Sequence, residues 1–306
     1  MPQENDVLSV AAIREQVVPG SREILFLARQ SIFWVGLNSP GGPGTLATLD
    51  QARQSSHPVR VLLDTDNNEV LSAQLVSAGE KSNFEARLKL LPNPDPPKPV
   101  DLKKIDPSTF NIVTDHLTSN AFVYCPTIVP GFAEAQRLFD ICAGQSCHLG
   151  APSPCITFQY LLDGCHARAH KMRYLIENEG YCCAKAFAFA PLAPYKLASR
   201  ANKWGHCCVA WWFHVVPLVP VQVDALFQAA MVIDPSMFDR PVLYSTWLES
   251  LEDTSCYAAA KVMMQSVEEG TAYGPADATG DNYHQDDDYS MTDAFLLAHE
   301  SDWTCP

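Results

Sequence analysis

The sequence predicts an α+β fold in which a helix that carries a cysteine packs on an antiparallel sheet, preceded by a small α/β module. Three observations predict it: a capped helical pattern at 163–180, three β-like runs after it, and a proline-rich stretch that separates both from an apolar N-terminal region. With 306 residues, 47% of them hydrophobic, the chain is long enough for two unequal domains.

The N-terminal region has the pattern of a strand, a short helix and a hairpin. Residues 21–37 are rich in large apolar and β-favouring residues, and Thr45 to Gln54 suits a short helix. Val59–Leu63 and Val70–Val76 lie on either side of a polar turn, which indicates a hairpin. We expect residues 1–92 to form a small β-α-β-β module that serves as a lid or pro-segment.

A proline-rich stretch follows this module. Leu91 to Pro107 contains six prolines, which oppose helix formation and favour extended backbone. We therefore expect a linker at 93–118 and a second, larger domain at 119–306. The linker contains Lys103-Lys104, an exposed dibasic pair that a processing protease could cut.

Two helices are predicted in the larger domain. The first covers Gly131 to Cys142, and the second covers residues 163–180, with Asp163 as N-cap and Gly180 just after the C-terminus. Cys165 then lies in the first helical turn, on the buried side, whereas Arg168 and Glu179 point elsewhere. The apolar face repeats at helical spacing through Cys165, Ala169, Met172 and Ile176.

Three β-like runs follow the second helix. They are Ala184–Ala190, Cys207–Val219 and Ala229–Asp234, separated by Pro-, Asn- or polar-rich connections. In the middle run, period-two alternation predicts that His214 shares a face with Trp212.

Eleven cysteines are more than a typical cytosolic enzyme contains and indicate an oxidising compartment. We expect a secreted protein, although no export signal is visible at the start of the sequence. If one thiol is kept for chemistry, ten cysteines remain for up to five disulfides. The short loop between Cys147 and Cys155 is the pairing that the sequence favours most.

The formal net charge of −14 argues against nucleic acid as a partner, because phosphate binding needs a basic face. No apolar run reaches the roughly 18–20 residues of a membrane-spanning helix, so we expect no membrane partner. The tail from Asp277 to Asp302 holds eight acidic residues and neither Lys nor Arg. We expect a solvated acidic rim there, in preference to a calcium site built on Asp286, Asp287 and Asp288.

Three residues form a candidate set for nucleophilic catalysis. Cys165 lies at a helix N-terminus, where the helix dipole favours thiolate and lowers the thiol pKa. A thiolate nucleophile needs a histidine to hold its proton and a third group to orient the imidazole. His214, on an apolar strand, and Asp234, at the end of the next strand, are the candidates. Each of these residues alone is more often structural than catalytic.

A zinc site is the rival interpretation of the histidines. His166 and His170 have the i, i+4 spacing of two ligands on a helix, and His206-Cys207 follows downstream. Since the sequence has neither an HExxH motif nor a CxxC pair, we expect no metal site.

Several short motifs strengthen the catalytic interpretation: SPCITF (153–158), DGCHARAHKMR (163–173), NEGY (178–181), CCVAW (207–211), IDPS (233–236) and TSC (254–256). Together they resemble bacterial secreted protein-glutaminase, of the transglutaminase-like superfamily of cysteine hydrolases. The resemblance implies a transglutaminase/papain-like core with Cys165 as nucleophile, His214 as base and Asp234 as orienting carboxylate, without a metal or organic cofactor. Residues 21–90 are similar to that family's pro-region.

The implied reaction is hydrolytic deamidation of protein-bound glutamine to glutamate, with ammonia release through a cysteine thioester. The expected partners are protein or peptide substrates that bear glutamine, and a protease that processes the pro-segment; we expect a monomer. The alternatives are a transglutaminase or cysteine peptidase of the same superfamily, and a catalytically silent binding or toxin-associated module.

We also expect the N-terminal module to keep the enzyme inactive by covering its site. A strand from Leu25 to Val35 is predicted to lie close to Cys165, with Phe33 and Trp34 buried against the aromatic residues around His214. The alternative is a permanent accessory domain that contributes stability or recognises substrate.

Overall fold

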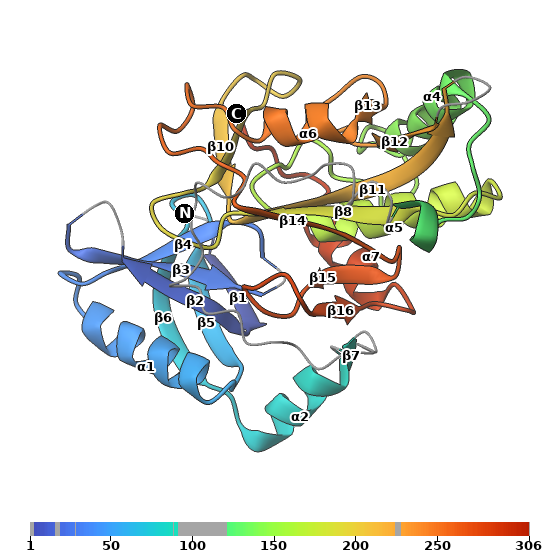
Figure 1. Ribbon diagram of the computed structural model, residues 1–306. Coiled ribbons are helices and arrows are strands. Elements are labelled where there is room, and N and C mark those ends of the chain that lie inside the picture. The colour runs from blue at the N-terminus through green and yellow to red at the C-terminus, as the bar shows by residue number, and fades with distance from the viewer. Residues whose placement is uncertain are drawn as a thin grey trace.

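The computed structural model confirms the predicted α+β fold (Figure 1). The described residues up to 90 form one part, called the N-terminal half below although it is the smaller one. It packs against the second half, which consists of the described residues from 121 onward. The predicted linker at 93–118 lies outside the described residues. The structure describes residues 3–15, 19–27, 29–87, 89–90, 121–223 and 228–305.

The N-terminal half is a six-stranded sheet in the order β1-β5-β6-β4-β3-β2, and α1 packs on it through Leu49 and Ala52. The predicted short helix and hairpin are confirmed as α1 and the antiparallel pair β5–β6. β1 and β2 were not predicted. The elements are β1 (Gln3–Leu8), β2 (Val10–Glu15), β3 (Ser21–Phe26), β4 (Ile32–Gly36), α1 (Gly42–Gln54), β5 (Val59–Asp64), β6 (Glu69–Leu75) and α2 (Ala78–Arg87).

The predicted single strand at 21–37 is two antiparallel strands, β3 and β4. Three polar residues, Arg29, Gln30 and Ser31, lie in the connection between them and are buried. Each of them donates a side-chain hydrogen bond to the second half of the chain, so they interrupt the strand instead of continuing it. The tip of this hairpin is thus a point of contact between the two halves.

The second half contains a five-stranded antiparallel sheet in the order β13-β12-β11-β8-β14, with α5 packed against β11. A small sheet, β15-β16-β7, joins both halves, because β7 (Lys89–Leu90) ends the N-terminal half. The elements are α4 (Phe132–Ala143), α5 (Cys165–Asn178), β8 (Ala184–Phe189), β9 (Leu197–Arg200), β10 (Cys208–Trp211), β11 (Phe213–Gln222), β12 (Gln228–Val232), β13 (Val242–Leu243), α6 (Tyr244–Ser250), β14 (Met264–Glu268), β15 (Ala272–Pro275), β16 (Tyr283–Gln285) and α7 (Ser290–Ala298).

Helix α5 begins at Cys165, and its N-cap lies one residue after the predicted Asp163. The N-cap is Gly164, with φ 78°, and a Cβ added there would meet the Phe295 ring at 2.1 Å. Asp163 is therefore not the N-cap. Gly180, with φ 85°, follows the helix as predicted. The predicted apolar face is buried, but Arg168 is buried as well, donating to the carbonyls of Tyr160 and Asp163, because α5 is covered on more than one side.

The predicted middle strand is broken at Trp212. β10 pairs with β9, whereas β11 pairs with β8 and β12, so period-two alternation does not run through the break. Trp212 packs in the same apolar cluster as Cys165, while the His214 ring stacks on Trp211. The predicted common face of Trp212 and His214 is therefore wrong.

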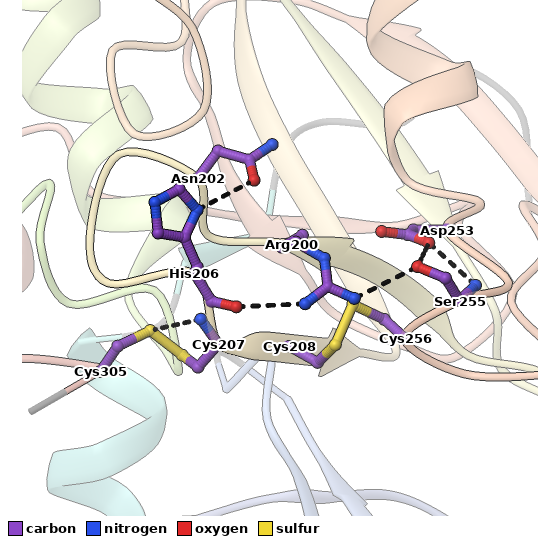
Figure 2. Close-up of a disulfide and its surroundings, with 9 residues drawn as sticks. All are labelled: Arg200, Asn202, His206, Cys207, Cys208, Asp253, Ser255, Cys256 and Cys305. Carbon is purple, nitrogen blue, oxygen red and sulfur yellow. Dashed lines mark hydrogen bonds between the residues drawn. A yellow bond between two sulfur atoms is a disulfide. The ribbon is translucent and has the colours of Figure 1, made fainter.

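The cysteines form four disulfides, and the predicted pair Cys147–Cys155 is one of them. Figure 2 shows that the adjacent Cys207 and Cys208 form disulfides with Cys305 and Cys256, respectively, so the first residue of β10 and the residue before it are linked to two distant segments. The fourth disulfide joins Cys125 to Cys182.

The four disulfides lie within the predicted limit of five and use eight of the eleven cysteines. Three cysteines are free and buried: Cys142, Cys165 and Cys183. Cys142 and Cys183 belong to one apolar cluster, where a thiol packs as a small hydrophobic side chain.

Because the Cys208–Cys256 link closes a long loop, we expect the double variant Cys208→Ala/Cys256→Ala to lower the free energy of unfolding by about 2–5 kcal/mol. Denaturant unfolding measures this, and peptide mapping without reduction should show all four links in the parent protein. If the parent's cysteines alkylate freely, the disulfides and the oxidising location that they imply are both wrong.

The acidic tail is not a uniform solvated rim. Asp286 is 4% exposed, and its carboxylate accepts hydrogen bonds from the Met291 and Thr292 backbone and the Thr292 hydroxyl, which anchors the start of α7. Within the described part of the chain, no group of three or more His, Cys, Asp or Glu residues could hold a metal ion. Asp286, Asp287 and Asp288 thus do not gather into such a group. No helix in the described ranges is long and apolar enough to span a bilayer.

Candidate active site

Cys165 lies at the N-terminus of α5 and is 1% exposed. It packs in an apolar cluster with Leu25 of the N-terminal half and with Phe213 and Val215 of β11. Burial raises the pKa of its thiol above the ordinary value, although the charge of Arg168 and a backbone hydrogen bond from Val215 oppose this. The lowered pKa expected from the sequence is therefore wrong for this covered form, because loss of water outweighs the helix N-terminus.

His214 and Asp234 form a buried pair. The His214 Nε2 atom lies 3.1 Å from Asp234 Oδ2, and each residue is 1% exposed. The other carboxylate oxygen accepts from the Ser236 backbone N–H at 3.1 Å and from the Ser236 hydroxyl. Burial favours the neutral acid, but the hydrogen bonds from His214 and Ser236, with the charge of Arg168, lower the pKa of Asp234.

The His214 ring lies between two tryptophans. Its centroid is 4.9 Å from that of Trp211 and 5.9 Å from that of Trp247, with near-parallel planes. Its Nδ1 atom is buried and has no hydrogen-bond partner among the residues that the structure describes. Because Nε2–H donates to the carboxylate, neutral His214 carries its free lone pair on Nδ1. That nitrogen is able to accept a proton.

The structure brings the three predicted residues into one buried region. The Val215 backbone, next to His214, hydrogen-bonds the Cys165 thiol, and the Asp234 charge acts on the same thiol. A thiol, an imidazole with an unpaired nitrogen and an ionised carboxylate can support nucleophilic attack on an amide carbonyl.

A residue that sequence analysis missed lies directly against Cys165. Gln30 is fully buried, and its side-chain carbonyl Oε1 accepts a hydrogen bond from the Cys165 backbone N–H at 3.2 Å. Its Nε2 donates to the Leu161 carbonyl at 2.7 Å. The polar Arg-Gln-Ser triplet inside an otherwise apolar run was the signal that could have indicated this insertion.

The main chain around Gln30 is held like an added strand. Its N–H donates to Asp163 Oδ1 at 2.9 Å, and its carbonyl accepts from the Trp212 N–H at 3.1 Å. Ser31 forms an antiparallel bridge with Trp211, and its hydroxyl donates to the Leu162 carbonyl.

Arg29 anchors the same segment. One guanidinium nitrogen donates to Asp163 Oδ2 at 2.9 Å, and another contacts Asp6 at 2.7 Å and Glu4. Burial opposes ionisation of Asp163, but the charge of Arg29, with a smaller effect of His166, and the hydrogen bonds from the Gln30 backbone and Arg29 together lower the pKa of this carboxyl. Asp163 thus accepts donors from both Arg29 and Gln30 of the N-terminal half.

The N-terminal segment lies close to Cys165, as predicted, but the predicted contacts of Phe33 and Trp34 are wrong. Leu25 and the hairpin tip lie at Cys165, but Phe33 packs in the core of the N-terminal half. The indole N–H of Trp34 donates to the Asn67 carbonyl, so neither aromatic side chain reaches His214. The reason is that the polar tip, and not the apolar strand, enters the site.

The two helix histidines on which the rival zinc interpretation was based make other contacts in the structure. The His170 ring donates to the Asp286 carbonyl at 3.1 Å and accepts from Lys185 Nζ at 2.7 Å. Burial lowers the pKa of Lys185 to about 7 and that of His166 to about 3. His166 lies edge-on against Tyr273, so both histidines are core residues.

Comparison with known proteins agrees with this site. Residues 135–251 match a family model described as glutaminase. A crystal structure of pro-protein-glutaminase is 26% identical over 99% of this chain and 95% of its own, with a TM-score of 0.73. A crystal structure of protein-glutaminase, and the NMR structure of protein-glutaminase from Chryseobacterium proteolyticum, are each 34% identical over 58% of this chain and 91% of their own, with TM-scores of 0.51 and 0.52. No curated protein sequence matches.

The fold and these matches define a glutaminase with an N-terminal extension. This chain belongs to the protein-glutaminase family and has the fold of its pro-form.

Proposed function

We propose that this chain deamidates protein-bound glutamine with Cys165 as nucleophile, His214 as base and Asp234 as the carboxylate that orients His214. The observation that carries the proposal is the buried thiol at the start of α5, next to a His214–Asp234 pair whose Nδ1 is unpaired. Membership in the protein-glutaminase family supports the choice of a glutamine side chain as substrate.

In the proposed reaction, His214 Nδ1 takes the Cys165 proton as the sulfur attacks the glutamine carboxamide. The Cys165 backbone N–H stabilises the oxyanion; such a donor contributes roughly 3 kcal/mol. Ammonia leaves with a proton from His214, and a water molecule activated by His214 hydrolyses the thioester to glutamate. Asp234, ionised by its hydrogen bonds, fixes the tautomer that leaves Nδ1 free.

We propose residues 1–92 as a pro-segment, 93–118 as a linker and 119–306 as the catalytic domain. The match to a pro-form covers 99% of the chain, whereas the match to protein-glutaminase covers 58%, which supports this division. Buried polar contacts across the two halves also support it. Arg14 donates to the carbonyls of Ala190 and Tyr195, and Glu23 pairs with Lys196 at 2.8 Å.

We further propose a secreted monomer that acts on protein or peptide substrates after a protease has removed the pro-segment. Four disulfides suit an oxidising compartment. A transglutaminase, a cysteine peptidase and a silent binding module remain the alternatives that experiment must separate.

The test is to cut and remove the N-terminal segment and then incubate the catalytic part with a glutamine-containing peptide and with casein. We expect ammonia release and conversion of glutamine to glutamate, without crosslinks or new chain ends. Crosslinks to lysine amines would indicate a transglutaminase, and new termini a peptidase. No reaction of any kind would contradict the proposal and favour a silent binding module.

A further inference from the structure

We propose that Gln30 is an internal substrate of this chain, which Cys165 deamidates in cis so that position 30 becomes a glutamate. This inference rests on the proposed function. Its basis is the position of the Gln30 carboxamide, which is fully buried. Gln30 Oε1 accepts a hydrogen bond from the Cys165 N–H, the donor that is proposed to stabilise the oxyanion. A substrate glutamine would place its own carboxamide oxygen on the same donor.

The subsite recognises an amide and not an acid. The Leu161 carbonyl accepts two N–H donors, Gln30 Nε2 at 2.7 Å and the Trp211 indole at 2.6 Å. A glutamate carboxylate would put an oxygen against that carbonyl, where neither atom could donate. The site therefore holds the reactant form of residue 30 better than its product.

Main-chain contacts set the direction and depth of the bound segment. The Gln30 N–H donates to Asp163, its carbonyl accepts from Trp212, and Ser31 pairs with Trp211. Arg29 binds the other oxygen of Asp163. A protein substrate bound as a strand would use the same Asp163 and Trp212 groups, so Arg29–Gln30–Ser31 is bound as a substrate segment would be.

The reaction balances without an added oxidant or reductant. A bond forms between Cys165 Sγ and Gln30 Cδ while the thiol proton passes to His214. The Cδ–Nε2 bond then breaks, and the nitrogen leaves as ammonia with that proton. Water gives a proton to His214 and its oxygen to Cδ, the Cδ–Sγ bond breaks, and the sulfur regains a proton. One water is consumed, and the amide becomes a carboxylic acid and ammonia.

We expect this conversion to be slower than turnover of an external substrate by the uncovered site. Burial raises the pKa of the Cys165 thiol, so less of it is thiolate in the covered form. Water also has to reach a site whose residues are buried, Gln30 fully and Cys165 to all but 1%, to complete hydrolysis. A Cys165–Gln30 thioester that persists would be the intermediate of the same reaction.

The experiment compares the full-length chain with its Cys165→Ala variant. Both are purified, incubated and analysed by peptide mass spectrometry for glutamate, or a thioester to Cys165, at position 30. We expect at least about tenfold more conversion in the parent than in the variant. Gln159 is the internal control: it is also buried, but its amide donates to the Glu300 carbonyl and not near Cys165.

Three outcomes would overturn the inference. Equal conversion in the Cys165→Ala variant would mean spontaneous deamidation. Conversion of Gln30 in that variant only after mixing with the parent would mean a reaction in trans. An intact Gln30 in parent protein whose trimmed form still releases ammonia from a peptide would leave the proposed function standing and remove the internal substrate.

Discussion

Replacement of Cys165 by alanine is expected to lower ammonia release from a glutamine peptide by a factor of about 10⁴ or more. Cys165 is free of disulfides and buried, so the substitution removes the proposed nucleophile and only one small side-chain atom from the packing. The measurement is ammonia release by the catalytic part after removal of residues 1–92. The melting temperature serves as the check that the variant is folded.

The chain offers two matched controls for this variant. Cys142 and Cys183 are also free and buried, and burial raises the pKa of both thiols. Cys142→Ala and Cys183→Ala should each retain most of the activity, because these thiols lie in another apolar cluster. Retained turnover in folded Cys165→Ala would remove Cys165 as nucleophile.

We expect variants of the other two proposed catalytic residues to lose activity in a defined order, with a larger loss at His214 than at Asp234. His214→Ala should be nearly as damaging as Cys165→Ala, since the variant loses the nitrogen that is proposed to take the thiol proton. Asp234→Asn should cost less, because an amide oxygen can still accept from His214 Nε2 at the 3.1 Å position. An Asp234→Asn loss larger than that of His214→Ala would contradict an orienting role.

Local patterns in the sequence predicted much of the fold. Helix periodicity identified α5 and its buried Cys165 face, and Gly180 marked its end. The β5–β6 hairpin followed from two alternating runs around a polar turn, in which Asp64 accepts from the Asp66 backbone at 3.0 Å and from the Asn67 amide at 3.0 Å. These features depend on neighbours in the chain, and so they are visible in sequence.

The errors occurred where contacts between distant residues decide the outcome. Asp163 looked like an N-cap, but its carboxylate is engaged by Arg29 and Gln30, more than 130 residues away. The strand through Trp212 breaks because that residue pairs with the Gln30 backbone. Cys165 has a raised pKa because a distant segment covers it. None of these partners is adjacent in sequence, so alternation and capping rules could not identify them.

Cleavage near Lys103-Lys104, with removal of the released N-terminal segment, is expected to raise deamidation of a protein substrate about a hundredfold or more. In the intact chain Gln30 accepts the hydrogen bond of the Cys165 N–H. Its neighbours Arg29 and Ser31 hold it there through hydrogen bonds to Asp163 and to the Leu162 carbonyl, respectively. A tethered segment meets its site at an effective concentration near millimolar, so a protein substrate competes poorly with it. The measurement is the rate on casein before cutting, after cutting, and after separation of the fragments.

The three stages of that experiment separate tethering from contact. If the buried Arg29–Asp163 pair holds the segment without the linker, cutting alone should raise the rate less than separation does. The Cys165→Ala protein, cut in the same way, controls for ammonia released by the protease treatment. Full-length Arg29→Ala offers an independent route to the same result, since loss of its bond to Asp163 should weaken docking and raise the basal rate without cleavage. An unchanged or lower rate after separation would make residues 1–92 a permanent domain, because a segment that only blocks the site cannot be needed for turnover.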